Sequence, residues 1–318
     1  MCYSAQIRAD YKKLVRNYGA IMSIKEFAEL YLFDEGKARP KTPKGMDDAF
    51  VGADDPQVQA IAAAVAQWRA VEAGKLEEEL FAQKTRLVGA ERALQTKVTK
   101  KAQNDVRVAT NKIERARAKL SDLNRSEPLP RDARVFPGVY APVIVMEGGR
   151  RVIKPMRYQC RLCGKPANYD VRFPGTYNAR RDNLEGFWGQ AFGRNHGVII
   201  VDAFYENVAR HAMEGRALGV GEQEENVVLE FRPQPAQEMV IACLWSEWDG
   251  PEGRLLSFAA ITDDPPAEVA AAGHDRCIVQ IKPENIDAWL NPDPANLAAS
   301  YAVLDDRPRP YYEHQLAA

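Results

Sequence analysis

The sequence changes character twice, and its middle section sets the strongest limit on the fold. Pro40 and Pro56 lie near the end of the first section, and no further proline occurs until Pro128. Within this proline-free section, apolar or small residues recur at steps of three and four, the spacing of a helix with one apolar face. From residue 94 onward these positions are Val98, Ala102, Val106, Ala109, Ile113, Ala116, Leu120 and Leu123. We expect two or three helices packed as an antiparallel hairpin, with breaks at Gly74 and Gly89.

Basic residues are concentrated in the second half of this helical section. Between positions 92 and 124, Lys and Arg outnumber the three acids Asp105, Glu114 and Asp122. The basic residues are Arg92, Lys97, Lys100, Lys101, Arg107, Lys112, Arg115, Arg117 and Lys119. Such a face has the charge to lie along a phosphate backbone. A solvated coiled-coil surface and a contact with a protein partner are the alternatives, and the sequence leaves all three open.

After Pro128 the sequence consists of short apolar runs separated by turns, which is typical of strands. The runs are VYAPVIVM, GVIIVDAFYE, NVVLEF, EMVIACLW, RLLSFAAIT and RCIVQI. Helical segments accompany them, SIKEFAELYLF near the start and NIDAWL near the end. Together these patterns predict an α+β fold with a curved, mainly antiparallel sheet and a long helical insertion. We therefore expect one catalytic domain formed by residues 1–54 and 125–318, interrupted by helices at 55–124.

Composition limits the cellular setting. The chain is 46% hydrophobic, which is normal for a soluble globular protein, and carries a formal net charge of −1. Bulk charge therefore gives no sign of nucleic-acid binding, and an anionic partner needs a local basic patch. No run of about 18 apolar residues occurs, and the start MCYSAQIRADYKK lacks the apolar stretch of a secretion signal. We expect a cytoplasmic protein without membrane contact.

The five cysteines fit a reducing compartment better than a disulfide framework. Cys160 and Cys163 form a CxxC pair in CRLCGKP, but no second pair follows at the spacing of a structural zinc site. Cys243 or Cys277 would complete such a site only if folding brought them close. We expect no metal and no cofactor.

Cys2 becomes the first residue if Met1 is removed, which usually happens when the second residue is small. The chain would then begin with an amine and a thiol on one residue, whose ordinary pKa values are about 7.7–8 and 8.5. The amine can add to an aldehyde to give an imine, and the thiolate can close on the same carbon to form a five-membered thiazolidine. Position alone does not separate this chemistry from an unreactive residue that merely follows the translation start.

Six short motifs occur in order along the chain. They are MCYSA at the start, PMRY at 155–158, TYNARRDNL at 176–184, VDAFYENV at 201–208, CLWSEW at 243–248 and AAGHDRCIV at 271–279. This ordered set resembles the SOS response-associated peptidase (SRAP) family, with its initial Met-Cys, Met-Arg-aromatic, Asn-Ala-Arg-x-Glu-Thr, Asp-Gly-aromatic-Tyr-Glu, Leu-Trp and His-x-Arg-Met elements. The resemblance covers about residues 1–30 and 150–292. It implies a protein that joins covalently to abasic sites in single-stranded DNA, the expected partner.

The resemblance also implies roles for four residues. Cys2 would be the crosslinking nucleophile and Glu206 the acid and base, since imine formation needs one proton removed and another delivered. Asn178 would position the reacting end of the chain through its amide. His274 would lie against the sugar of the opened abasic site and help to open it by proton exchange. Removal of Met1 by the same nucleophile, reversal of the crosslink through Glu206, and association with the nucleoid when DNA is bound are also implied.

DNA contacts are implied for three further residues. Arg180 and Arg276 would bind phosphates on either side of the lesion, and Tyr158 would stack on a base exposed beside it. The ordinary alternatives are Tyr158 as a core residue, Asn178 in an Asx turn, Glu206 as a surface carboxylate and His274 as a turn residue.

Several positions depart from the family pattern. Tyr3 and Ser4 follow the cysteine where family members commonly carry Gly and Arg, which removes one expected phosphate contact. The other departures are Asp182, Asn183, Ala203, Asn207 and Cys277. Two other functions stay open: a thiol peptidase or amidohydrolase using Cys2 and His274, and a noncatalytic DNA-binding scaffold using the basic helices.

Overall fold

The structure is a computed structural model that describes residues 4–32, 38–251 and 253–317. It divides into two compact units, one formed by Met1–Val51 with Pro130–Ala318 and the other by Gly52–Leu129. The role of the larger unit as one catalytic domain stays a prediction.

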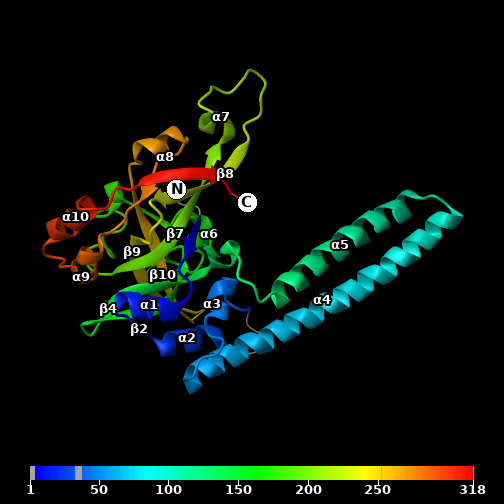
Figure 1. Cartoon of the computed structure of the whole chain (residues 1–318), viewed down its shortest axis with the longest axis horizontal. Coiled ribbons are helices and arrows are strands. Elements are labelled where there is room, and N and C mark those ends of the chain that lie inside the picture. Colours follow the sequence, from blue (N-terminus) through cyan, green and yellow to red (C-terminus); the bar gives the residue numbers. More distant parts are fainter. Residues whose placement is uncertain (1–3, 33–37, 252, 318) are drawn as a thin grey trace. The chain divides into compact units, whose positions relative to one another are not determined.

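The smaller unit is a hairpin of two helices, α4 (Pro56–Thr96) and α5 (Lys100–Asn124), joined by residues 97–99 (Figure 1). Each helix begins at a side-chain cap, because Asp55 accepts hydrogen bonds from the first turn of α4 and Thr99 accepts one from Ala102 in α5. The predicted breaks at Gly74 and Gly89 are wrong, since α4 continues through both positions. A helical glycine costs only about 1 kcal/mol relative to alanine, which packing along a hairpin offsets.

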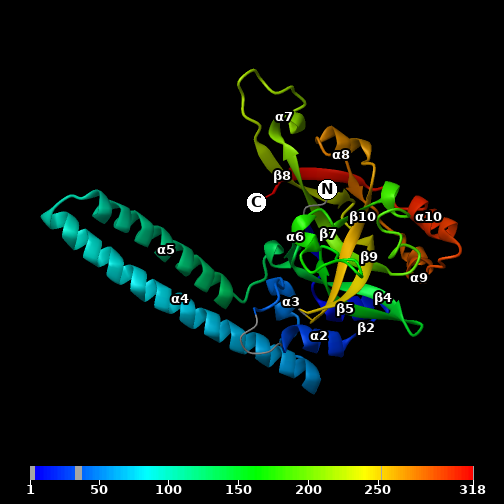
Figure 2. The same cartoon turned by 180° about the vertical axis from the view of Figure 1, so that it is seen from behind.

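The larger unit contains a sheet of twelve strands with short helices around it. The strands are β1 (Ser4–Ile7), β2 (Ile21–Met22), β3 (Arg134–Val135), β4 (Tyr140–Glu147), β5 (Arg150–Tyr158), β6 (Asn178–Arg180), β7 (His196–Ala209), β8 (Asn226–Gln234), β9 (Met239–Gly250), β10 (Gly253–Asp263), β11 (Cys277–Ile278) and β12 (Tyr311–Leu316). The helices are α1 (Tyr11–Tyr18), α2 (Ile24–Tyr31), α3 (Lys44–Asp48), α6 (Tyr169–Arg172), α7 (Arg210–Met213), α8 (Ala267–Ala271), α9 (Ile286–Leu290) and α10 (Leu297–Asp305). Helices α1 and α2 lie at one side of the sheet and α9 and α10 at another (Figures 1 and 2).

Five strands close into a barrel-like ring. Strand β4 pairs with β5 and β7, β9 pairs with β7 and β10, and β10 pairs with β5 to complete the circuit. The β5–β10 contact is parallel, as are β2–β5 and β6–β10, whereas the other strand pairs are antiparallel. The structure agrees with the expected mixture of helices and strands, with the curved sheet and with the long helical element. Closure of the sheet and its parallel pairs were not predicted.

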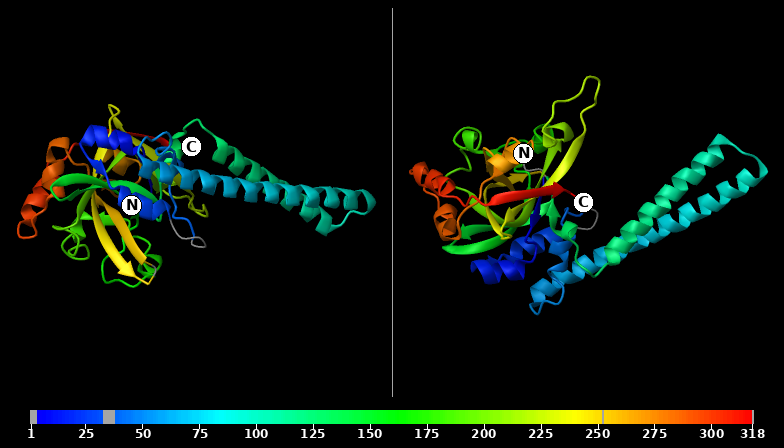
Figure 3. Two further views of the ribbon diagram at one scale, coloured as in Figure 1. Left: turned by 90° about the horizontal axis from the view of Figure 1, so that it is seen from below. Right: turned by 45° about the horizontal axis from the view of Figure 1, so that its top comes forward.

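Strand β7 is the centre of this unit. Its first half pairs with β4 and β9, and its second half pairs with β1 and β8. The last strand, β12, lies along β8 and extends the sheet from that side (Figure 3). Most of β7 is therefore buried, including His196 and Glu206, whereas Asn207 is exposed.

Candidate functional site

Two of the predicted site residues meet in the structure. Glu206 lies in the second half of β7 and is 0% exposed. His274 lies in the turn between α8 and β11 and is also buried. The turn is made by Gly273, whose φ of +91° is the left-handed conformation that glycine adopts readily. Nε2 of His274 is 3.2 Å from Oε2 of Glu206.

The second ring nitrogen of His274 fixes the protonation pattern of this pair. Nδ1–H donates a hydrogen bond to the backbone carbonyl of Arg276 at 2.8 Å, because a carbonyl can only accept. In the neutral ring Nε2 is then an acceptor, and the proton between the two groups belongs to Glu206. In the charged ring Nε2–H donates to a carboxylate. Burial lowers the pKa of His274, which favours the neutral ring.

The geometry therefore allows one proton to lie between Glu206 and His274, on either partner. Such a pair can accept a proton from a reacting group and return it in a later step. Both sequence motifs predicted these residues separately, and neither motif indicated the contact between them.

Strand β1 begins close to this pair. Ser4 lies opposite Tyr205 in the β1–β7 register, one residue from Glu206. Nε of Arg134 donates to the Ser4 hydroxyl at 3.0 Å, and its guanidinium lies 3.8 Å from the centre of the Tyr205 ring. No motif marked Arg134. Its guanidinium places a cation beside Ser4, the position where the family pattern carries arginine. Cys2 itself lies outside the described residues.

Asn178 is the first residue of β6, so the Asx-turn alternative is wrong. It is buried, and β6 runs parallel to β10 with Asn178 opposite Ala260. Its side-chain oxygen accepts a hydrogen bond from the Thr262 hydroxyl. Among the residues that the structure describes, this hydroxyl on β10 fixes the orientation of the amide.

Arg180 and Arg276 line one surface depression. Its other lining residues are Arg181, Asp182, Thr262, Asp263, Asp264 and Asp275. Arg180 is exposed and forms an ion pair with Asp182, and Nε of Arg276 is 3.6 Å from Asp275. The structure thus brings the two predicted phosphate ligands together, but acidic residues already accompany them. A phosphate in this depression would have to compete with these carboxylates.

A family model for the SOS response associated peptidase (SRAP) matches residues 96–316, more than half of the chain. The chain belongs to the SRAP family. Membership associates it, through the family's name, with the SOS response and with peptidases. The matched residues include Asn178, Glu206 and His274, whereas Cys2 and all of α4 except its last residue precede them. A search of the curated proteins found no match.

Solved structures with similarity to this SRAP chain come from two bacteria. A protein from Bordetella bronchiseptica is 18% identical with a TM-score of 0.47, over 61% of this chain and 90% of its own. A protein from Bacteroides thetaiotaomicron is 13% identical with a TM-score of 0.44, over 56% of this chain and 74% of its own. A phage-related protein from B. bronchiseptica is 17% identical with a TM-score of 0.44, over 61% and 85%.

Tyr158, at the Met-Arg-aromatic motif of the SRAP pattern, is a core residue here. It is 3% exposed and stacks on Phe258 with ring centres 5.1 Å apart. The edge of Tyr177 closes the same cluster at 5.6 Å. The proposed stacking on a DNA base is therefore corrected, because the ring is packed inside the protein. The core alternative is the one that the structure favours.

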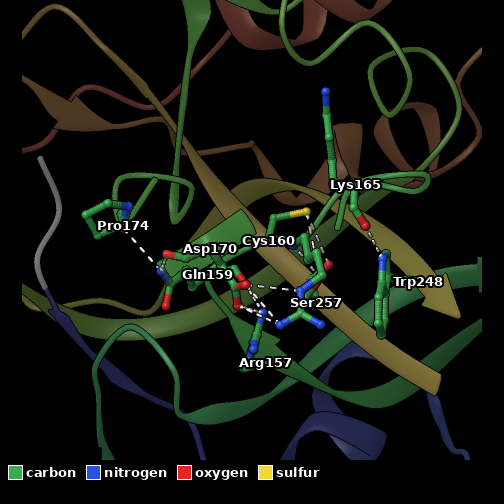
Figure 4. Close-up of polar contacts among 9 residues, drawn as sticks. Arg157, Gln159, Cys160, Lys165, Asp170, Pro174, Trp248 and Ser257 are labelled. Carbon is green, nitrogen blue, oxygen red and sulfur yellow. Dashed lines mark hydrogen bonds and ion pairs between the residues drawn. The ribbon is translucent and has the colours of Figure 1, made fainter. Parts of the chain in front are cut away.

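The CxxC segment follows this tyrosine and joins a buried ionic cluster (Figure 4). Asp170 receives hydrogen bonds from Arg161 at 2.9–3.2 Å and forms an ion pair with Arg157. The Cys160 thiol is buried, which raises its pKa to about 12, and lies 3.7 Å from the carbonyl oxygen of Ser257. These contacts fix the loop after β5, and they give Cys160 no reactive character.

Two features are absent from the described part of the SRAP chain. Residues 4–32, 38–251 and 253–317 contain no grouping of three or more His, Cys, Asp or Glu able to hold a metal ion. Within the same ranges, no helix combines the length and the apolar character needed to cross a membrane.

Proposed function

We propose that this SRAP protein captures abasic sites in single-stranded DNA by forming a covalent bond through Cys2 after removal of Met1. The observation that carries the proposal is the buried Glu206–His274 pair beside the strand that begins the chain. The pair supplies a shared proton where an N-terminal amine would react.

Cys2 precedes the first described residue of β1, Ser4, by two positions. Ser4 lies opposite Tyr205, the neighbour of Glu206. Two residues of chain span at most about 7 Å, so the Cα of Cys2 is within that distance of the Cα of Ser4. The reach supports a reaction at Cys2 that uses Glu206.

The chemistry proceeds through an imine. The α-amine of Cys2 attacks the aldehyde of the ring-opened deoxyribose, a proton leaves the nitrogen, and another is delivered to the hydroxyl, which departs as water. The Glu206–His274 pair provides both transfers. The Cys2 thiolate then closes on the same carbon, and the nitrogen takes a proton, to give the thiazolidine. Reversal uses the same steps in the opposite order.

The remaining residues fit supporting roles. Asn178, held by Thr262, would orient the reacting groups, and Arg180 and Arg276 would bind flanking phosphates. Cleavage of Met1 by the thiol of Cys2 would precede capture.

Capture is tested with an oligonucleotide that carries one abasic site. We expect wild-type protein to give an adduct that survives denaturing electrophoresis, with an intact mass lacking Met1. Cys2→Ala should give none, whereas Cys163→Ala, which removes the exposed thiol of the CxxC pair, should retain it. An adduct of undiminished yield from Cys2→Ala would refute the proposal.

Glu206→Gln tests the proton transfers. We expect adduct formation and release to slow together by about 10²–10⁴-fold, the usual contribution of a positioned acid or base. Unchanged rates of both steps would remove Glu206 from the mechanism while leaving capture by Cys2 intact.

A thiol peptidase is the second candidate. It is favoured by the acceptor nitrogen of His274, which has the character of a base for Cys2, and by the name of the family. Turnover of peptide substrates without a DNA adduct would support this candidate instead.

A further inference from the structure

Helix α5 carries a line of hydrogen-bond donors along its outer face. Lys100, Asn104, Arg107, Asn111 and Arg115 follow one another at steps of three and four, and we call them the α5 stripe. All five side chains are exposed. The buried positions of α5 are instead Ala102, Ala109, Ile113 and Ala116, which form the opposite face of the helix.

The charge of this face is not neutralised within the hairpin. Of the three acids on α5, Asp105 pairs with Arg86 of α4 and Asp122 pairs with Arg125 beyond the helix end, while Glu114 makes no ion pair among the described residues. Lys112 pairs with Glu79 of α4. Among the described residues, no ion pair is made by the three cations of the α5 stripe, and Arg107 donates only to the amide oxygen of Asn104.

We propose that the α5 stripe binds the phosphodiester backbone of a nucleic acid, independently of sequence. The inference rests on this helix alone and not on the proposed chemistry of Cys2. At 1.5 Å per residue the stripe is about 22 Å long, enough to follow several phosphates of one strand. Lys101, Arg117 and Lys119 lie on the same helix and raise the local positive potential.

The side chains favour a nucleic acid over an acidic protein as the partner. Phosphate contacts are made by Arg and Lys together with amides such as Asn, which is the composition of the stripe. Protein interfaces instead centre on buried aromatic or apolar residues. Helix α5 has no exposed large hydrophobic residue between positions 100 and 124, a range described throughout.

The test compares two triple variants of the full chain on unmodified DNA without an abasic site. Lys100→Gln/Arg107→Gln/Arg115→Gln removes the cations of the stripe. A matched control, Lys75→Gln/Lys84→Gln/Arg92→Gln, removes three exposed cations of α4 and changes net charge equally. Glutamine is a good helix former, and circular dichroism verifies that both hairpins fold.

We expect the stripe variant to bind about tenfold more weakly or worse at low salt, while the control binds like wild type. The slope of log K against log salt should fall by about 0.7 per lost contact for single strands and about 0.9 for duplex, which identifies the form bound. Equal affinities of the stripe variant and wild type on both DNA forms would overturn the proposal.

Lysine protection locates the contact. Bound DNA should shield Lys100 from acetylation in the wild-type protein, measured by peptide mass spectrometry, while Lys75 and Lys84 stay reactive. Equal labelling of all three lysines would also overturn the proposal. Because the DNA has no abasic site, neither result depends on whether Cys2 forms an adduct.

Discussion

His196, at the start of β7, makes the stability of the fold depend on pH. Its ring stacks on Trp289 with centres 3.8 Å apart. Nδ1–H donates to the backbone carbonyl of Trp289, and Nε2 accepts from the backbone N–H of Gly193, both at 2.9 Å. Both nitrogens are satisfied by a neutral ring, and burial lowers its pKa to about 4.

The sign and size of the effect follow from linkage. Between its ordinary pKa of 6.5 and the folded value of about 4, His196 binds a proton in the unfolded chain but not in the folded one. The unfolded state therefore binds more protons, and the free energy of unfolding falls as pH falls through this window. From pH 7 to pH 4.5, the two pKa values give a loss of about 2 kcal/mol.

The assay is urea unfolding of wild type and His196→Phe at both pH values. Phenylalanine keeps a ring in the stack but cannot titrate, so the variant should lose about 2 kcal/mol less than wild type on acidification. Its lower stability at pH 7, from the two lost hydrogen bonds, does not enter this difference. His314→Phe, at an exposed position of β12, controls for removal of a histidine. Parallel losses in wild type and His196→Phe would refute the reasoning.

Two further predictions concern stability. Gly74→Ala and Gly89→Ala should each stabilise the hairpin by about 1 kcal/mol, because an added Cβ meets no atom within 4 Å. Thermal melting followed by circular dichroism of the helices measures this, and a lower melting temperature of either variant would contradict it. Asp170→Asn should cost about 3–5 kcal/mol in urea unfolding, since it leaves two guanidinium groups without their carboxylate. The exposed control Asp182→Asn should cost about 1 kcal/mol or less, and equal losses would argue against the buried cluster.

Strands were predictable where the apolar signal was local. VYAPVIVM and EMVIACLW correspond to β4 and β9, because a buried strand needs a continuous apolar run. The run RCIVQI forms only the two-residue strand β11. Further along the run, Gln280 pairs with Ile241 as an isolated bridge rather than as part of a strand. Closure of the ring depends on β10 meeting β5, a pairing between distant segments that leaves no local pattern.

The contact between Glu206 and His274 was not predictable from the sequence. The motifs marked Glu206 and His274 individually, whereas their contact depends on how the turn after α8 folds against β7. Tyr158 lies at a strand end, where alternation allows a ring to face inward or outward, and packing on Phe258 decided the direction. Arg134 belongs to no motif, and only the β1–β3 pairing brings it to Ser4.

The electrostatics of burial explain why Glu206 and His274 should act as one unit. A carboxylate at a position with no exposed surface is costly unless a proton or a cation compensates for its charge. His274 offers that compensation, and its other nitrogen is committed to the Arg276 carbonyl, so the ring cannot turn away without losing a hydrogen bond. Either placement of the shared proton leaves the pair neutral overall. A proton can therefore move between Glu206 and His274 without changing the net charge of the pair, which suits the acid-and-base role proposed for Glu206.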